Sequence, residues 1–127
     1  MKKTVLLVDD DPDQIFQVSH YLKKWGYEVV ALESREDAER YLEGNCPDLA
    51  ILDLMMEEED SGFILSYRIK QCRPEIPVII ATAVAAERGI SFDLNSPESK
   101  TWIRADYYLE KGFRMEQLKS VIENLLK

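Results

Sequence analysis

Residues 4–10 read TVLLVDD, a run of five Thr, Val and Leu residues that ends in two aspartates. A run this short and this rich in β-branched and aliphatic side chains is typical of a strand. The chain contains four more such runs, at residues 27–32, 49–52, 78–81 and 107–109. Because these runs are nearly continuously apolar, they indicate a parallel sheet that is covered on both faces.

Segments with helical spacing lie between the runs. After the first run, apolar residues recur at steps of three and four, at Ile15, Val18, Leu22 and Trp25. This pattern predicts a helix that opens with Asp13 as its cap and closes at Gly26. His20 lies off the apolar stripe, which favours a solvated position over a ligand or a phosphorelay histidine.

Three further helices are expected. One runs from a Ser34 cap to Gly44, the next covers residues 63–69, and the last covers residues 115–125. Strand and helix therefore alternate, which predicts a single doubly wound α/β domain over residues 1–127. The stretch from 84 to 104 is less regular, but Ser96-Pro97-Glu98 indicates the start of a short helix over about 97–104.

The composition limits the function. The 127 residues carry 16 basic and 24 acidic side chains, which gives a net charge of −8. This balance argues against a protein that coats nucleic acid or binds an anionic membrane, since both need cationic contacts. No stretch approaches the roughly 18 apolar residues that span a bilayer, and acids follow the first run too soon for a signal peptide. We therefore expect a soluble, cytoplasmic protein.

Two cysteines, Cys46 and Cys72, stand far apart in the sequence, and His20 is the only histidine that could join them in a metal site. A structural zinc site usually needs four such ligands, so none is expected. A disulfide is an alternative. However, a chain of this size can bury a core that needs no cross-link, and this favours reduced thiols that serve only as packing residues.

Polar side chains follow several of the predicted strands. In an open parallel sheet, ligands collect at the carboxyl ends of the strands. The residues found there are Asp9, Asp10 and Asp11 after the first run, Asp53 after the third, Thr82 and Ala83 after the fourth, and Lys111 after the fifth. Asp11 and Asp13 are interpreted as no more than a cap and first-turn acids of the following helix.

Carboxylates that lie close together repel and raise one another's pKa, so either one is protonated or a cation joins them. A hard divalent ion, most naturally Mg²⁺, would bind through one or two carboxylates and keep waters that a phosphoryl group can displace. The lysine and the threonine hydroxyl would contact the remaining phosphoryl oxygens. A nucleophile, a metal site and such donors are the parts that phosphoryl transfer needs.

Four motifs, taken in order, resemble the receiver domain of two-component response regulators. They are Leu6-Leu7-Val8-Asp9-Asp10, Leu52-Asp53-Leu54, Ile80-Ala81-Thr82-Ala83 and Tyr107-Tyr108-Leu109-Glu110-Lys111. The resemblance covers nearly the whole chain. It implies a flavodoxin-like sheet of five parallel strands in the order 2-1-3-4-5, with helices on both faces. It also implies a signalling switch that is no enzyme, beyond accepting a phosphoryl group from a phosphodonor and slowly hydrolysing it.

The resemblance assigns a role to each matching residue. It makes Asp53 the phosphoacceptor, which takes the group from a sensor histidine kinase or a phosphotransfer protein. It makes Asp9 and Asp10, with Asp53 and the backbone carbonyl of Met55, the ligands of Mg²⁺.

The remaining roles concern the response to phosphorylation. Thr82 and Lys111 correspond to the pair that registers the new phosphoryl group, and Tyr108 corresponds to the switch aromatic. No output domain follows residue 127 in this sequence, so the switch either acts on an unknown downstream protein or is a fragment cut from a longer chain.

Three features depart from the family's pattern. Lys111 is followed by Gly112, where the family usually has a proline joined by a cis bond. Without proline a cis bond costs about 3 kcal/mol, so the direction of the lysine is in question. The acceptor loop at 55–62 lacks the usual Met-Pro turn and carries an acidic run. The interval from Thr82 to Lys111 is longer than the family norm, which predicts a remodelled fourth helix.

Two other functions stay open. One is a phosphorylation-independent scaffold of the same fold, which Gly112 and the altered loop leave open. The other is a phosphatase of the haloacid-dehalogenase type, since Asp9-x-Asp11 faintly resembles the nucleophile motif of that family. No acidic pair follows Lys111 to hold the metal of such an enzyme. A flavin carrier is disfavoured because a row of aspartates would repel a cofactor phosphate.

Overall fold

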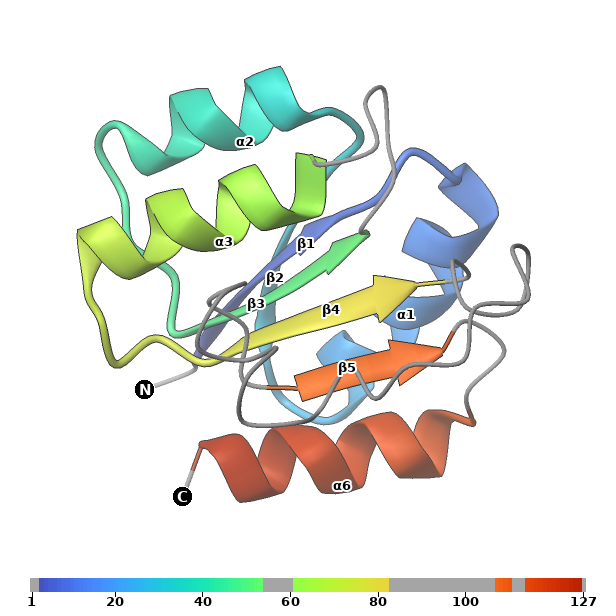
Figure 1. Cartoon of the computed structure of the whole chain (residues 1–127). Helices are drawn as coiled ribbons and strands as arrows, with labels where there is room; N and C mark the ends of the chain where they lie inside the picture. Colours follow the sequence, from blue (N-terminus) through green and yellow to red (C-terminus); the bar gives the residue numbers. More distant parts are fainter. Residues whose placement is uncertain (1–2, 54–60, 83–106, 111–113, 127) are drawn as a thin grey trace.

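The computed structural model describes residues 3–53, 61–82, 107–110 and 114–126 (Figure 1). Strands alternate with helices along residues 3–82, and one more strand and one more helix follow in the other described ranges. The strands are β1 (Thr4–Val8), β2 (Glu28–Leu32), β3 (Leu49–Asp53), β4 (Val78–Thr82) and β5 (Tyr107–Glu110). The helices are α1 (Pro12–Lys24), α2 (Arg35–Leu42), α3 (Ser61–Cys72) and α6 (Met115–Leu125). Each of the five predicted runs forms a strand.

The five strands form one parallel sheet in the order β2-β1-β3-β4-β5. The arrowheads of β3, β4 and β5 in Figure 1 point to the same edge of this sheet. The chain leaves β1 for β2 on one side and returns to pair β3 on the other, so the strand order reverses between β1 and β3. Ligands of open parallel sheets bind outside the carboxyl ends of the strands at such a reversal.

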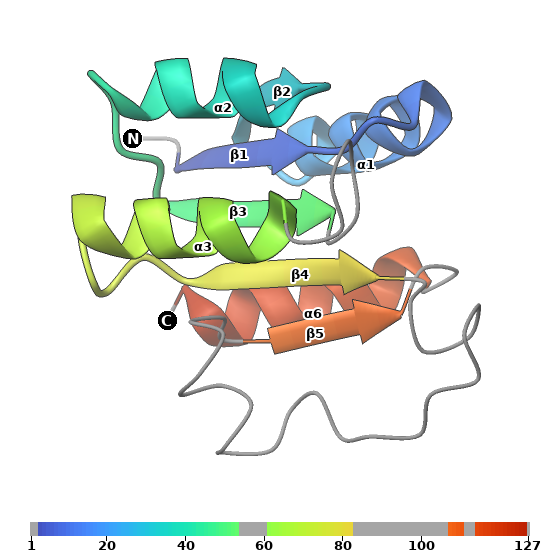
Figure 2. The same cartoon turned by 45° about the horizontal axis from the view of Figure 1, so that its top comes forward.

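Helices cover both faces of the sheet. Figure 2 shows α2 and α3 on one face and α1 and α6 on the other. Each face of the sheet has its own hydrophobic core, because successive side chains of a strand point to opposite faces. Leu6 and Val8 of β1 pack toward α2 and α3, whereas Val5 and Leu7 pack toward α1 and α6. This double coverage explains why the strands are apolar at nearly every position. The predicted doubly wound α/β fold and its strand order are confirmed.

Helix α1 starts earlier than predicted and ends as predicted. It begins at Pro12, and the side chain of Asp11 caps it by accepting a hydrogen bond from the Asp13 backbone N–H at 3.0 Å. The predicted Asp13 cap is therefore wrong, and Asp13 is a first-turn acid. The helix ends at Lys24, and after its C-cap Trp25 comes Gly26, whose φ of 96° suits a residue without a side chain. Gly26 and Tyr27 donate backbone hydrogen bonds to the Lys23 and Leu22 carbonyls, which closes the last turn.

The other helices follow the predicted patterns. Ser34 caps α2 by accepting a hydrogen bond from the Asp37 N–H at 3.2 Å. The apolar residues of α6 reach the core, with Leu118, Val121 and Ile122 buried. The short helix expected at 97–104 and the predicted remodelling between Thr82 and Lys111 fall on residues outside the described ranges.

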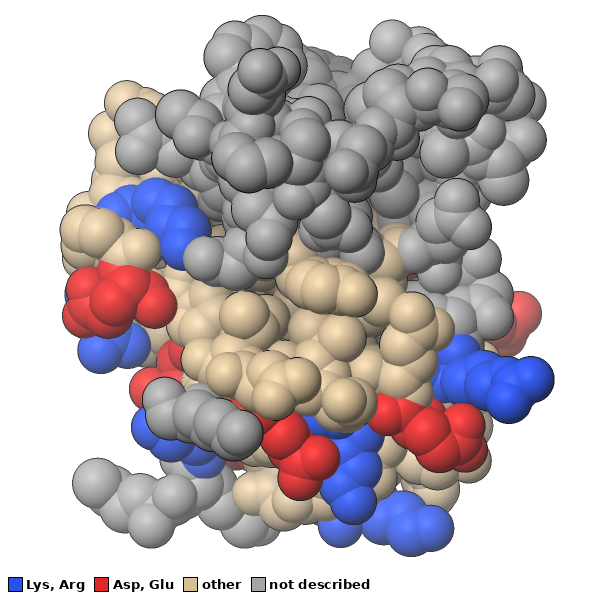
Figure 3. Space-filling model, turned by 60° about the horizontal axis from the view of Figure 1, so that its bottom comes forward, with Lys and Arg blue, Asp and Glu red and all other residues tan. Residues whose placement is uncertain are grey.

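The surface on the α6 side carries both signs of charge. Figure 3 shows acidic and basic side chains interspersed around a band of uncharged residues. The described residues of this face therefore form no one-sign basic patch of the kind that typifies a nucleic-acid contact. Among the described residues, no helix combines the length and the apolar character needed to cross a membrane.

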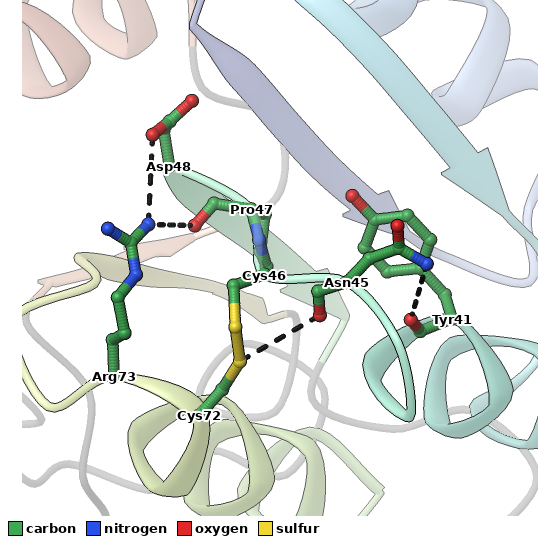
Figure 4. The surroundings of a disulfide bond; sticks show 7 residues. All are labelled: Tyr41, Asn45, Cys46, Pro47, Asp48, Cys72 and Arg73. Carbon is green, nitrogen blue, oxygen red and sulfur yellow. Dashed lines mark hydrogen bonds and ion pairs between the residues drawn. A yellow bond between two sulfur atoms is a disulfide. The ribbon is translucent and has the colours of Figure 1, made fainter.

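The prediction of two reduced cysteines is wrong. Cys46 and Cys72 form a disulfide, with their Cα atoms 6.3 Å apart (Figure 4). Cys46 lies in the loop that leads into β3, and Cys72 is the last residue of α3, just before the chain turns into β4. Because β3 and β4 are parallel neighbours, the segments that lead into them lie at the same edge of the sheet. Separation along the sequence did not reveal this proximity.

Candidate functional site

The first acidic residue of the site follows β1. Asp9 is 2% exposed, and its backbone N–H donates to the Leu32 carbonyl at 3.1 Å, which extends the pairing with β2. Its carboxylate oxygen Oδ1 accepts a hydrogen bond from the Asp11 backbone N–H at 2.9 Å. The turn from β1 into α1 therefore fixes the direction of the Asp9 carboxylate.

The second buried acid ends β3. Asp53 is the last residue of that strand and is 4% exposed. The register pairs Val8 with Leu52, so Asp9 and Asp53 take the next positions along two neighbouring strands. Parallel pairing of a five-residue apolar strand with its neighbour thus brings together two acids that lie 44 residues apart in the sequence.

Three carboxylates meet at this edge. Single oxygens of Asp9, Asp10 and Asp53 all lie within 4.8 Å of one another, with Asp10 exposed to solvent and the other two buried. Charges of one sign at this distance repel, and burial weakens the screening by water. Oxygen ligands of this kind suit a hard divalent cation such as Mg²⁺, which favours one or two carboxylates together with water and phosphate oxygens. The donor set therefore fits the predicted magnesium site.

The sequence placed further residues at this site, and the structure describes them in part. Thr82 ends β4, one position beyond Ala81, which is the register partner of Asp53. Thr82 itself pairs with Glu110, the residue that precedes Lys111. Tyr108 lies in β5 opposite Ile80. For Thr82 and Tyr108 only the backbone is described, and Met55, Lys111 and Gly112 lie outside the described residues.

Sequence reasoning missed one residue of this region, Phe16. Its side chain is 76% exposed on α1, beside a shallow groove that Ile15, Ser19, Ala31 and Glu33 also line. Phe16 comes one residue after the start of the apolar stripe and therefore points away from the core. An apolar residue on the polar face of a predicted helix was the signal that could have revealed it. His20 is exposed, as predicted.

Comparison with known proteins assigns the family. The family described as the response regulator receiver domain matches residues 5–123. The heme response regulator HssR of Staphylococcus saprophyticus is 36% identical over 124 residues, which cover 98% of this chain and 51% of HssR. The transcriptional regulatory protein RprY of Bacteroides fragilis is 31% identical, over 99% of this chain and 50% of RprY. The chain thus spans about half the length of these relatives.

Solved structures agree with this assignment. The receiver domain of DrrB, activated by BeF3, superposes with a TM-score of 0.80 and 26% identity, over 99% of this chain and 98% of that one. The response regulator TrrA of Thermotoga maritima, solved in complex with Mg²⁺-BeF, gives a TM-score of 0.77 and 27% identity, over 99% and 100% of the two chains. These matches give no support to a phosphatase or to a scaffold.

Sequence match, strand order and the acidic edge of the sheet lead to one conclusion. The chain belongs to the response regulator receiver domain family of two-component signal transduction.

Proposed function

We propose that Asp53 is the phosphoacceptor of this receiver domain. The observation that carries the proposal is the meeting of the Asp9, Asp10 and Asp53 carboxylates within 4.8 Å at the carboxyl edge of the sheet. Asp53 ends the central strand β3, which is paired on both sides, so the backbone that carries its carboxylate is held rigidly. A rigidly held nucleophile next to a cation site is what transfer of a phosphoryl group requires.

The same carboxylates would hold Mg²⁺. Asp9, Asp10 and Asp53 are the proposed side-chain ligands, and the backbone carbonyl of Met55 is a further proposed ligand. When bound, Mg²⁺ neutralises the charge that spreads over the phosphoryl oxygens. Asp11 is not one of the proposed ligands, but it orients one of them. Its backbone N–H donates a hydrogen bond to the Asp9 carboxylate, and its own side chain caps α1.

In the proposed reaction an oxygen of Asp53 attacks the phosphorus atom of a phosphohistidine. The P–N bond breaks, the imidazole nitrogen keeps the electron pair and takes up a proton, and Asp53 becomes an aspartyl phosphate. Attack of water on the phosphorus later returns the carboxylate and releases inorganic phosphate. Self-phosphorylation from a small phosphodonor follows the same course with a different leaving group.

The response to phosphorylation is assigned to residues at the ends of β4 and β5. We propose that the Thr82 hydroxyl and the Lys111 ammonium contact the new phosphoryl group and that Tyr108 changes position with Thr82. The backbone register supports this, because Thr82 lies opposite the residue that precedes Lys111. The new charge would thereby bias a two-state element that a partner reads.

The proposed donor is a sensor histidine kinase or a phosphotransfer protein, and the proposed location is the cytoplasm. The direct test uses phosphoramidate, a small donor that needs no protein recognition. Incubation of the wild-type chain with phosphoramidate and Mg²⁺ is expected to raise its intact mass by one phosphoryl group. A mass that stays unchanged with fresh donor and Mg²⁺ would overturn the proposed function in favour of a scaffold.

We propose that a donor protein docks at the exposed Phe16 side chain. Phe16 lies about one helical turn from the start of α1, and the groove beside it includes Pro12 and Glu33 at the same edge of the sheet as Asp9. Exposed aromatic side chains that become buried on binding contribute much of the affinity of protein interfaces. A protein that brings a phosphohistidine to Asp53 must cover this neighbourhood.

The Phe16→Ala variant is therefore expected to separate the two kinds of donor. Transfer from a histidine kinase that labels the wild type should slow about 10-fold or more, because an aromatic anchor is lost. Labelling by phosphoramidate should stay unchanged. The matched control is Tyr67→Ala, which removes a 51% exposed aromatic from α3 on the opposite face. Equal slowing in both variants would contradict docking at α1.

A further inference from the structure

We propose that the Cys46–Cys72 disulfide is a redox-responsive clasp on the segment that carries Asp53. The inference concerns how firmly α3, the helix that follows the proposed phosphoacceptor, is held, and it rests on that function for its purpose. The clasp links the loop before β3 to the end of α3, so residues 46–72 form a covalently closed loop (Figure 4). Asp53 lies within this loop.

The placement of the disulfide leaves the acidic site intact. β3 starts next to Cys46 and ends with Asp53, so the cross-link and the carboxylates lie at opposite ends of one strand. β3 is also held by β1 and β4, whereas α3 is held to the sheet by side-chain packing. A change at the clasp therefore acts first on α3 and leaves the Asp53 strand in place.

The disulfide is open to chemical attack. Cys46 is exposed to solvent and Cys72 is half-buried. Exposed disulfides are more easily reduced than buried structural ones, and disulfides are rare where glutathione and thioredoxin keep thiols reduced. In the cytoplasm proposed for this receiver the bond would therefore break by exchange with a cellular thiol and form again by the reverse exchange with the disulfide of that thiol.

The exchange reaction is balanced with a cellular thiol as the reductant. Its thiolate attacks the Sγ atom of Cys46, the S–S bond breaks, and Cys72 leaves as a thiolate that takes a proton from water. In the resulting mixed disulfide, one sulfur belongs to the reductant and the other to Cys46. A second thiolate of the reductant then attacks the reductant's sulfur. This releases the thiol of Cys46 and leaves the reductant as its own disulfide.

Noncovalent contacts beside the clasp keep the fold together after reduction. The guanidinium of Arg73 donates to the Pro47 carbonyl at 3.1 Å and lies 3.7 Å from the Asp48 carboxylate. That carboxylate accepts a hydrogen bond from the Thr4 backbone N–H at 2.8 Å. These contacts join the end of α3 to the starts of β3 and β1. Reduction is thus expected to loosen α3 without unfolding the domain.

The test compares the oxidised chain, the reduced chain and the Cys46→Ser/Cys72→Ser variant. Closure of a loop of this length restricts the unfolded chain, so reduction should lower the melting temperature by about 10 °C. Amide hydrogen exchange through local opening should become about 10-fold faster in α3 and stay unchanged in α6, because of these two helices only α3 is tied by the clasp. The double variant should behave as the reduced chain does and ignore added thiol.

Glutathione buffers of varied ratio show whether the bond opens under cellular conditions. A disulfide that survives in mostly reduced glutathione would overturn the proposal, and so would equal melting and equal exchange of the two forms. Phosphoramidate labelling, run on both forms, keeps the two proposals apart. Labelling of both forms is expected. If neither form is labelled, the phosphoacceptor proposal fails, while exchange in α3 still decides whether the clasp exists.

Discussion

Replacing Asp53 by Asn is expected to abolish the phosphoryl adduct that phosphoramidate forms on the wild-type chain. An amide oxygen is a poor nucleophile, and the variant keeps nearly the same shape at the end of β3. Loss of an attacking group typically reduces such a reaction by far more than about 100-fold, so no adduct should be seen in the intact mass spectrum. The residue is 4% exposed, so the fold of the variant is to be checked by its melting curve.

The matched control for this substitution is Asp13→Asn. Asp13 is an exposed first-turn acid of α1 and is not one of the three clustered acids, so its replacement makes the same change of charge near the site. This control should be labelled as well as the wild type. Full labelling of the Asp53→Asn variant would contradict the proposal and would point to another nucleophile, with Asp9 as the phosphatase alternative predicts.

Replacing Asp10 by Asn is expected to remove the response of the chain to Mg²⁺. Asp10 is the exposed member of the three-carboxylate cluster, so the change disturbs the core less than one at Asp9 or Asp53. For the wild type, Mg²⁺ at 100 times its dissociation constant should raise the free energy of unfolding by about 2.7 kcal/mol. Even outer-shell partners of metal ligands alter affinity about 10- to 100-fold, so the loss of a direct ligand should remove most of this stabilisation.

The sign of the effect without metal is an independent check. Asn at position 10 relieves repulsion among the clustered carboxylates, so the metal-free variant should melt slightly above the metal-free wild type. Thermal melts with EDTA and with Mg²⁺ measure both effects, and Asp13→Asn again serves as the control. A variant that Mg²⁺ stabilises as much as the wild type would place the cation elsewhere.

Most of the fold follows from local patterns in the sequence. The runs at 4–8 and 49–53 are apolar at nearly every position because α-helices cover both faces of the sheet, and this makes them easy to recognise. Gly26 marks the end of α1 because the chain there needs a positive φ. The start of α1 was predicted less well, since Asp11 and Asp13 are both good caps and only the structure shows which one accepts the hydrogen bond.

The acidic cluster was predictable for a topological reason. Carboxyl ends of parallel neighbours meet at one edge, so Asp9 and Asp53 had to lie close together once β1 and β3 were paired. The strand order itself came from the resemblance to a family. The disulfide was out of reach because the pairing of Cys46 with Cys72 depends on how two loops lie at the opposite edge. Arguments from chain length and redox compartment carry no information about the distance between Cys46 and Cys72.

The exposure of Phe16 was missed for another reason. The apolar stripe of α1 predicts the helix without Phe16, so the helical pattern alone does not single out an aromatic residue beside the stripe. Phe16 matters because its side chain is 76% exposed and lies next to the edge of the sheet that carries Asp9. Both facts come from the coordinates and not from the sequence pattern.

The most direct measurement locates the phosphoryl group in the chain. After labelling with phosphoramidate and Mg²⁺, borohydride reduction converts an aspartyl phosphate into a stable alcohol, and peptide mass mapping then identifies the modified position. The account predicts modification at Asp53 alone, and none when EDTA replaces Mg²⁺. Modification at Asp9, or a yield at Asp53 that does not depend on the metal, would contradict it.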